Sequence, residues 1–212
     1  MKKAIIVFLL TALVGFAFGQ QVKRVDLEGS RLRDFYLKQN VENLWLAGNH
    51  INWETGEPDN PYATKNIKTH CSAFVASVCK QKGVYILRPP EHKTELLANA
   101  QYNWLSSADG YKQGWRQIQD SIYEKAQEFA NKGFIVIAVY KNQNAKKPGH
   151  IALVMPIEKS IAYLFNEGPN LIQAGHINRN NVSLKEGFKN HISNWALAAN
   201  EISFFYQKNH YL

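Results

Sequence analysis

Cys71 is the residue whose type and position best suit covalent chemistry. It stands between a polar loop and an apolar run, in the segment Thr69-His70-Cys71-Ser72-Ala73-Phe74-Val75. If the apolar run is a helix, the thiol lies in its first turn, where the positive end of the helix dipole favours the thiolate. We therefore expect Cys71 to be a nucleophile, with the small residues Ser72 and Ala73 leaving its sulfur approachable.

The second cysteine, Cys79, provides an internal comparison. It follows Cys71 by eight residues, which in a helix is a separation of ~12 Å, whereas a disulfide needs Cα atoms within about 7 Å. We therefore predict two free thiols and a core position for Cys79. Two cysteines also exclude a disulfide-stapled scaffold and a four-cysteine zinc module.

His150 belongs to a second motif, Gly149-His150-Ile151-Ala152-Leu153-Val154, whose apolar residues are typical of a buried strand. Gly149 permits a tight turn, so the imidazole can lie at the sheet edge facing the start of the helix. From there it can take the Cys71 proton and later protonate a leaving amine. A lone histidine at the start of a strand is more often structural, so this assignment depends on Cys71.

Taken together, the two motifs resemble those of the papain-like cysteine hydrolases of the NlpC/P60 and CHAP superfamily. Those enzymes cut peptide or amide bonds, mainly in peptidoglycan. The matching segments are Cys71-Ser72-Ala73-Phe74-Val75 and Gly149-His150-Ile151-Ala152-Leu153, and the resemblance spans roughly residues 60–178. It implies a Cys71 nucleophile, a His150 base and acid, and a thioester acyl-enzyme. It implies no metal and no organic cofactor.

The resemblance also implies a third, polar residue that orients His150 from the strand after the histidine strand. We expect Gln173 in this role, because an amide can hold the second imidazole nitrogen. His176 and Asn178 are close competitors, and Asn166 is a weaker one.

Three further residues are expected to bind substrate. Tyr62, upstream of Cys71, resembles the family's tyrosine near the oxyanion, although it can equally be a loop aromatic. His70 stands where the NlpC/P60 pattern has Asp, and either alters substrate contacts or places a second imidazole beside the thiol. Ser72 follows the nucleophile.

The elements that position these residues follow from apolar periodicity. We expect helices over 30–45, 71–82, 94–105 and 120–131, a loop over 48–66, strands over 134–140, 151–155, 161–165, 170–174 and 202–207, and a short helix begun by the capping box Ser183-Leu184-Lys185-Glu186. Helices first and strands afterwards predict an α+β domain with a mostly antiparallel sheet. The resemblance implies the papain-like (NlpC/P60-like) version, with the cysteine helix packed on that sheet.

Residues 1–19 read as a secretory signal peptide. Lys2 and Lys3 precede an apolar run, and Ala17-Phe18-Gly19 offers small residues where a signal peptidase reads. The run of about 15 residues is shorter than the ~20 that span a bilayer. No cysteine follows it, so a lipoprotein is not expected. We predict a bacterial protein in the periplasm or the medium, with 20–212 as one domain.

Composition narrows the class of protein and its partners. Apolar residues are 45% of the chain and charged residues 20%, which excludes global disorder. The net charge of +8 is spread along the chain, so nucleic-acid binding is not expected. No apolar stretch after the predicted signal peptide is long enough to span a membrane, so no integral span is expected either. The expected partner is peptidoglycan or a cell-wall peptide, and the expected state is a monomer.

Two other functions remain open at this point. One is a papain-like acyl or amide transferase, which would use the same cysteine and histidine with an amine acceptor. The other is a non-catalytic cell-wall-binding protein on the same scaffold, against which the presence of both Cys71 and His150 argues.

Overall fold

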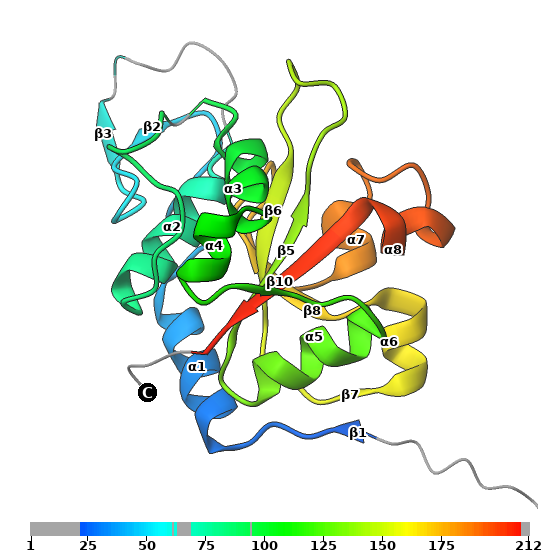
Figure 1. The fold of residues 1–212 in the computed structure, drawn as a ribbon. Helices are drawn as coiled ribbons and strands as arrows, with labels where there is room; N and C mark the ends of the chain where they lie inside the picture. The colour runs from blue at the N-terminus through cyan, green and yellow to red at the C-terminus, as the bar shows by residue number, and fades with distance from the viewer. Residues whose placement is uncertain (1–21, 61, 63–68, 94, 209–212) are drawn as a thin grey trace, which may run out of the picture.

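A six-stranded sheet with helices on both faces organises the chain (Figure 1). The computed structural model describes residues 22–60, 62, 69–93 and 95–208. The predicted signal peptide, 1–19, lies outside the described residues, as do 61 and 63–66 of the predicted loop, the following residues 67 and 68, and position 94. Among the described residues, no helix combines the length and hydropathy needed to cross a bilayer.

The sheet has the strand order β4-β10-β5-β6-β8-β9, and each neighbouring pair is antiparallel. Its strands are β4 (Arg116–Gln117), β5 (Ile135–Tyr140), β6 (His150–Val154), β8 (Asn170–Gln173), β9 (Arg179–Ser183) and β10 (Ile202–Gln207). The predicted α+β class with a mostly antiparallel sheet is therefore confirmed. Two small two-stranded sheets pair β1 (Val22–Lys23) with β7 (Lys159–Ser160) and β2 (His50–Ile51) with β3 (Pro58–Asn60).

Helices come from every part of the described chain. They are α1 (Leu27–Lys38), α2 (Cys71–Gln81), α3 (Leu97–Leu105), α4 (Ala108–Lys112), α5 (Ile122–Asn131), α6 (Ile161–Glu167), α7 (Leu184–Phe188), α8 (Ala198–Glu201) and the 3₁₀ turn Trp195–Leu197. In Figure 1, α1, α2 and α3 lie on one side of the sheet, and α5, α6 and α7 on the other.

Successive side chains leave a strand on opposite faces, so the side chains of the central strands belong alternately to two layers of the core. Ile137, Ile151 and Leu153 pack with α2 residues such as Phe74 in one cluster. The intervening residues, Val136, Ala138, Ala152 and Val154, pack with Phe188 of α7 and with α5 in the other. The sheet is buried on both faces, which explains the unbroken apolar runs of β5 and β6.

The first helix differs from its predicted span of 30–45. Asp26 caps it, since its side chain accepts the backbone N–H of Gly29 at 3.1 Å, so α1 begins before Ser30. It ends at Lys38, and Asn40 then takes a φ of 53°, which breaks the helix. The prediction mistook apolar residues of the following loop for a continuing helix face.

The predicted strand over 161–165 is also wrong, because this segment is helix α6. Ser160 caps it by accepting the N–H of Tyr163 at 3.2 Å. Sequence reasoning missed α4, β4 and β9 as well. These are short, and β9 reads Arg-Asn-Asn-Val-Ser, without an apolar alternation to mark a strand.

The elements that carry the candidate chemistry agree well with prediction. Helix α2 begins at Cys71 and ends before Gly83, whose φ of 66° suits a helix terminus. Strands β5, β6, β8 and β10 fall within a residue of their predicted bounds, while α3 and α5 begin later than expected. Ser183 caps α7 as predicted, with its hydroxyl accepting the N–H of Glu186.

Candidate active site

The site lies where the sheet opens between β6 and β8. Strand β6 pairs with β5 from His150 to Leu153, but its ladder with β8 joins only Leu153 to Ile172 and Val154 to Leu171. The first residues of β6 therefore have a partner strand on one side only. The N-terminus of α2 packs beside this unpaired part of the strand.

Cys71 is the first residue of α2, and its thiol is bonded to β6. The backbone N–H groups of Ile151, the residue after His150, of Ser72 and of Cys71 itself interact with the sulfur. Cys71 is only 5% exposed, and this burial raises the pKa of the thiol, while the three N–H groups act in the opposite sense. The predicted preference for thiolate is thus wrong for the resting protein, because burial raises the thiol pKa more than these N–H groups lower it.

His150 is held by the residue predicted to orient it. Its Nε2 lies 3.1 Å from the side-chain oxygen of Gln173, across the gap between β6 and β8. An amide oxygen only accepts, so Nε2 carries the proton and Nδ1 keeps a free lone pair. Burial, and secondarily the neighbouring His191, lower the pKa of His150 to about 3, while the Gln173 bond opposes them. At neutral pH His150 is an uncharged base.

The Cys71 thiol lies on the α2 side of the sheet, and the His150 imidazole lies on the α7 side. The side chain of Ile151 faces α2, so the His150 ring leaves β6 toward α7 and contacts Phe188, at 4.8 Å between ring centres. Within the described residues, no direct hydrogen bond joins the Cys71 sulfur to the imidazole. Free enzymes often show such catalytic contacts long or misaligned.

His191 belongs to this site, and sequence reasoning missed it. Its ring stacks on that of His150, with centres 4.6 Å apart and planes at 3°. It lies in the segment after α7, well beyond the stretch covered by the resemblance. No local pattern marks it, because the two histidines meet only through the packing of α7 on the sheet.

The other three candidates for the residue that orients His150 lie elsewhere. Asn178 is a structural tie: its side-chain oxygen accepts the N–H of Gly175, and its amide donates to the carbonyls of Val41 and Leu44 at 2.7 and 2.8 Å. Asn166 is exposed and bonds to its own helix, at the carbonyl of Ala162. His176 is exposed. Of the four candidates, Gln173 is the one in contact with His150.

A groove of about 770 Å³ includes His70, Ser72, Ala73, Trp53 and Pro148 in its walls. Both chain neighbours of Cys71 thus line the groove, whereas Cys71 itself and His150 are not among its lining residues. Nε2 of His70 lies 2.9 Å from the carbonyl oxygen of Asn49, which fixes the ring at the groove wall. The positions of His70 and Ser72 suit the substrate contacts predicted for them.

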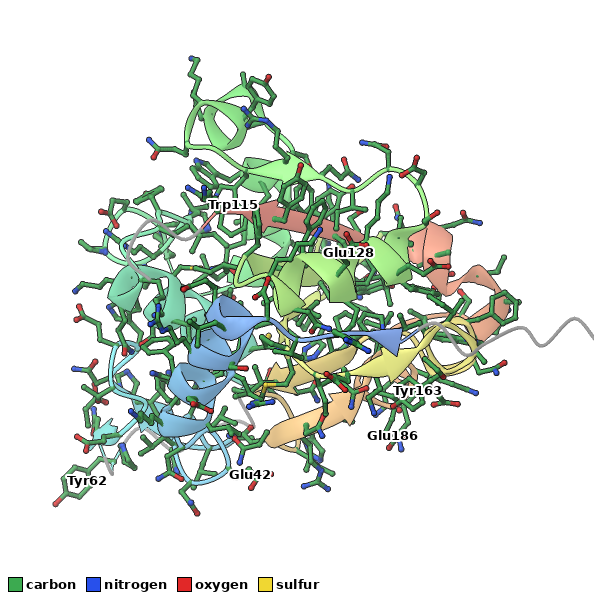
Figure 2. The ribbon with its side chains drawn as sticks, turned by 90° about the horizontal axis from the view of Figure 1, so that it is seen from below. Glu42, Tyr62, Trp115, Glu128, Tyr163 and Glu186 are labelled. Atoms are coloured by element: carbon green, nitrogen blue, oxygen red, sulfur yellow. The ribbon has the colours of Figure 1, made fainter. Side chains whose placement is uncertain are left out.

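Tyr62 does not reach the site. Its surface is 92% exposed, and Figure 2 shows its side chain at the outer edge of the molecule, pointing away from it. The backbone N–H of Tyr62 bonds to the side chain of Asn60 in a local turn. The expected role near the oxyanion is therefore not supported by this placement, and the alternative of a loop aromatic describes it.

Cys79 has the core position that its spacing predicts. Both cysteines are free, and Cys79 is fully buried on the apolar face of α2. Burial raises the pKa of its thiol to about 12. The two thiols therefore differ in setting: Cys71 lies between two groove-lining residues, and Cys79 is enclosed by the core.

Helix α3 supports both halves of the site. Gln101 is fully buried and donates to the carbonyls of Ser72 and Leu87, which anchors the first turn of α2. Asn99 donates to the carbonyl of Lys147 at 2.8 Å and accepts the N–H of Asn142 at 3.1 Å, which holds the loop between β5 and β6. The spacing of Cys71 and His150 is thus controlled by one helix.

The close packing at that loop explains Gly149. A Cβ there would lie 2.3 Å from the carbonyl oxygen of Tyr140 and 2.5 Å from the Asn99 side-chain oxygen. The glycine before His150 is required by this close approach, rather than by the free turn predicted from sequence.

This chain matches no protein-family model and no curated protein sequence.

Proposed function

We propose that this protein is an exported bacterial cysteine hydrolase of the papain-like kind, similar to the NlpC/P60 and CHAP enzymes, that cleaves a peptide or amide bond in peptidoglycan. One observation carries the proposal. The Gln173 side chain fixes the proton of His150 on Nε2, which leaves Nδ1 as a base, while the Cys71 thiol is bonded to the backbone of the very next residue, Ile151.

In the first step, His150 Nδ1 takes the thiol proton of Cys71, either after rotation of the thiol or through one water. The sulfur then attacks the substrate carbonyl carbon, and the carbonyl electron pair moves to oxygen. The first turn of α2 offers backbone N–H groups for this oxyanion, beginning with that of Cys71.

The oxyanion then collapses, the carbon–nitrogen bond breaks, and the amine leaves with the proton from His150. The product is a thioester on Cys71. A water molecule attacks this thioester with His150 again as base, which releases a carboxylic acid and restores the thiol. Atoms and charge balance in both halves, and the sum is hydrolysis of one amide bond.

At rest the thiol and the imidazole are both neutral, since burial raises the pKa of Cys71 and lowers that of His150. Substrate therefore has to trigger the proton transfer, in contrast to a site that stores a thiolate–imidazolium pair. This favours a low reactivity toward small electrophiles in the absence of substrate.

The test uses the mature protein, residues 20–212, with Cys71→Ala and the matched control Cys79→Ala. Each is incubated with purified peptidoglycan, and soluble products are identified by mass spectrometry. We expect new peptide or amine termini from the wild type and from Cys79→Ala, and none from Cys71→Ala.

A parallel reaction with an added amine acceptor separates hydrolysis from transfer, since a transferase would join the acceptor to the new acyl end. Equal product from Cys71→Ala would refute the assignment of the nucleophile. Binding to peptidoglycan by all three proteins without any product would replace the hydrolase by a wall-binding protein.

A further inference from the structure

The imidazoles of His150 and His191 form a stacked pair that the hydrolytic steps do not require. Their centres are 4.6 Å apart and their planes are almost parallel, at 3°. Phe188 meets both rings nearly edge-on, at 4.8 Å from His150 and 6.2 Å from His191. His150 is thereby enclosed by a ring face, a ring edge and the Gln173 amide.

The two rings differ in their access to protons. His150 is 4% exposed, whereas His191 is only partly buried. Burial lowers the pKa of both, and the presence of His191 further lowers that of His150. As the pH falls, His191 is therefore the first of the two to be protonated.

The titratable groups around the pair are few in the described part of the chain. From β5, the Tyr140 ring lies 5.9 Å from His191. From α7, Lys189 and Glu186 pair with each other at 2.6 Å, and Glu201 of α8 accepts the N–H of Ser193. From α2, the Cys71 thiol lies next to the backbone N–H of Ile151. No carboxylate among these neighbours hydrogen-bonds to either imidazole, so none offsets a second positive charge.

We propose that His191 is a positioning residue for His150: its ring fixes the plane of the catalytic imidazole when neutral, and its protonation stops His150 from accepting the Cys71 proton. This proposal rests on the proposed role of the Cys71–His150 pair. Two cations stacked in a buried site repel strongly, so a charged His191 opposes the imidazolium that His150 must become. The acid limb of Cys71 reactivity then follows the titration of His191.

Two substitutions separate the ring from its charge. His191→Phe keeps a flat ring against His150 but cannot be protonated, whereas His191→Ala removes both. Each is made in the Cys79→Ala background, so that Cys71 is the one thiol that alkylates. The measurement is the rate of alkylation by iodoacetamide from pH 5 to pH 9, which needs no substrate.

For His191→Phe we expect the ratio of the alkylation rate at the acid end of the range to that at pH 8 to exceed the parent's ratio by about threefold or more. For His191→Ala we expect slower alkylation at pH 8, because His150 loses its support. A His191→Phe profile that superimposes on the parent's would overturn the charge effect. A His191→Ala rate equal to the parent's at pH 8 would overturn the positioning role.

NMR titration of the histidine ring nitrogens gives an independent readout. We expect His191 to titrate above His150 in the parent, and the His150 titration to move to higher pH in His191→Phe. These outcomes are separable from the hydrolase test. If peptidoglycan is not cleaved but the alkylation profiles shift as stated, the proposed reaction fails and the paired imidazoles stand. If peptidoglycan is cleaved but the alkylation profiles do not shift, the proposed reaction stands and the proposed role of His191 fails.

Discussion

Among single residues, the contact between Gln173 and His150 shows what a sequence can reveal about a site. Gln173 was predictable because it falls on the strand after the histidine strand and carries an amide, and the structure joins the two side chains at 3.1 Å. The protonation of Cys71 was not predictable in the same way. Its exposure depends on how α2, α3 and β6 enclose it, and that burial raises the thiol pKa more than the neighbouring backbone N–H groups lower it.

Gln173→Leu tests the orienting bond. Leucine removes the acceptor and leaves the Nε2–H of His150 buried without a partner, so we expect turnover to fall by about 10- to 1000-fold. Gln173→Glu retains an acceptor and adds a negative charge, which should raise the pKa of His150 in an NMR titration. A Gln173→Leu variant with wild-type turnover would show that the imidazole is held by its stacked neighbours alone.

At the scale of elements, the parts with strong local signals were predictable and their ends were less so. The β-branched run of β5 and the glycine after α2 marked those elements clearly. The errors at α1 and α6 arose at caps: Asp26 and Ser160 begin helices where apolar spacing alone predicted later or different elements. The support that α3 gives to the site was beyond prediction, because Asn99 acts on a loop far along the chain.

Asn99→Ala tests that support, with Asn103→Ala as its matched control on the exposed side of α3. Two hydrogen bonds to the β5–β6 loop are lost, so we expect a destabilisation of about 2 kcal/mol in urea unfolding. Because the loop leads directly into His150, alkylation of Cys71 should slow as well. Asn103→Ala should change neither quantity. Equal effects of the two substitutions would mean that the loop is positioned by the sheet.

Considered as a whole, the molecule should be sensitive to acid through its buried histidines. The folded pKa of His150 is about 3, below the ordinary 6.5, so the unfolded chain binds more protons between these two values. Stability from the neutral imidazole is therefore complete above about pH 6.5 and is lost as the pH falls toward 3. The lowered pKa of His191 acts with the same sign.

Urea unfolding at pH 7.5 and pH 5.0 measures this effect. We expect the wild type to lose about 2 kcal/mol more between these pH values than His150→Gln, which has no imidazole to charge at this position. The exposed His176→Gln variant is the control and should follow the wild type. A His150→Gln protein with the same acid sensitivity as the wild type would place the sensitivity elsewhere.

The position of β10 in the sheet determines when the sheet can be completed. This strand, Ile202–Gln207, lies between β4 and β5, although it is synthesised after all the other strands. Until β10 has been synthesised, β5 has an unpaired edge. The core then also lacks Phe204 and Phe205, which are buried in the folded protein. If the chain crosses a membrane, as residues 1–19 predict, the sheet that carries His150 cannot be completed until β10 has crossed as well.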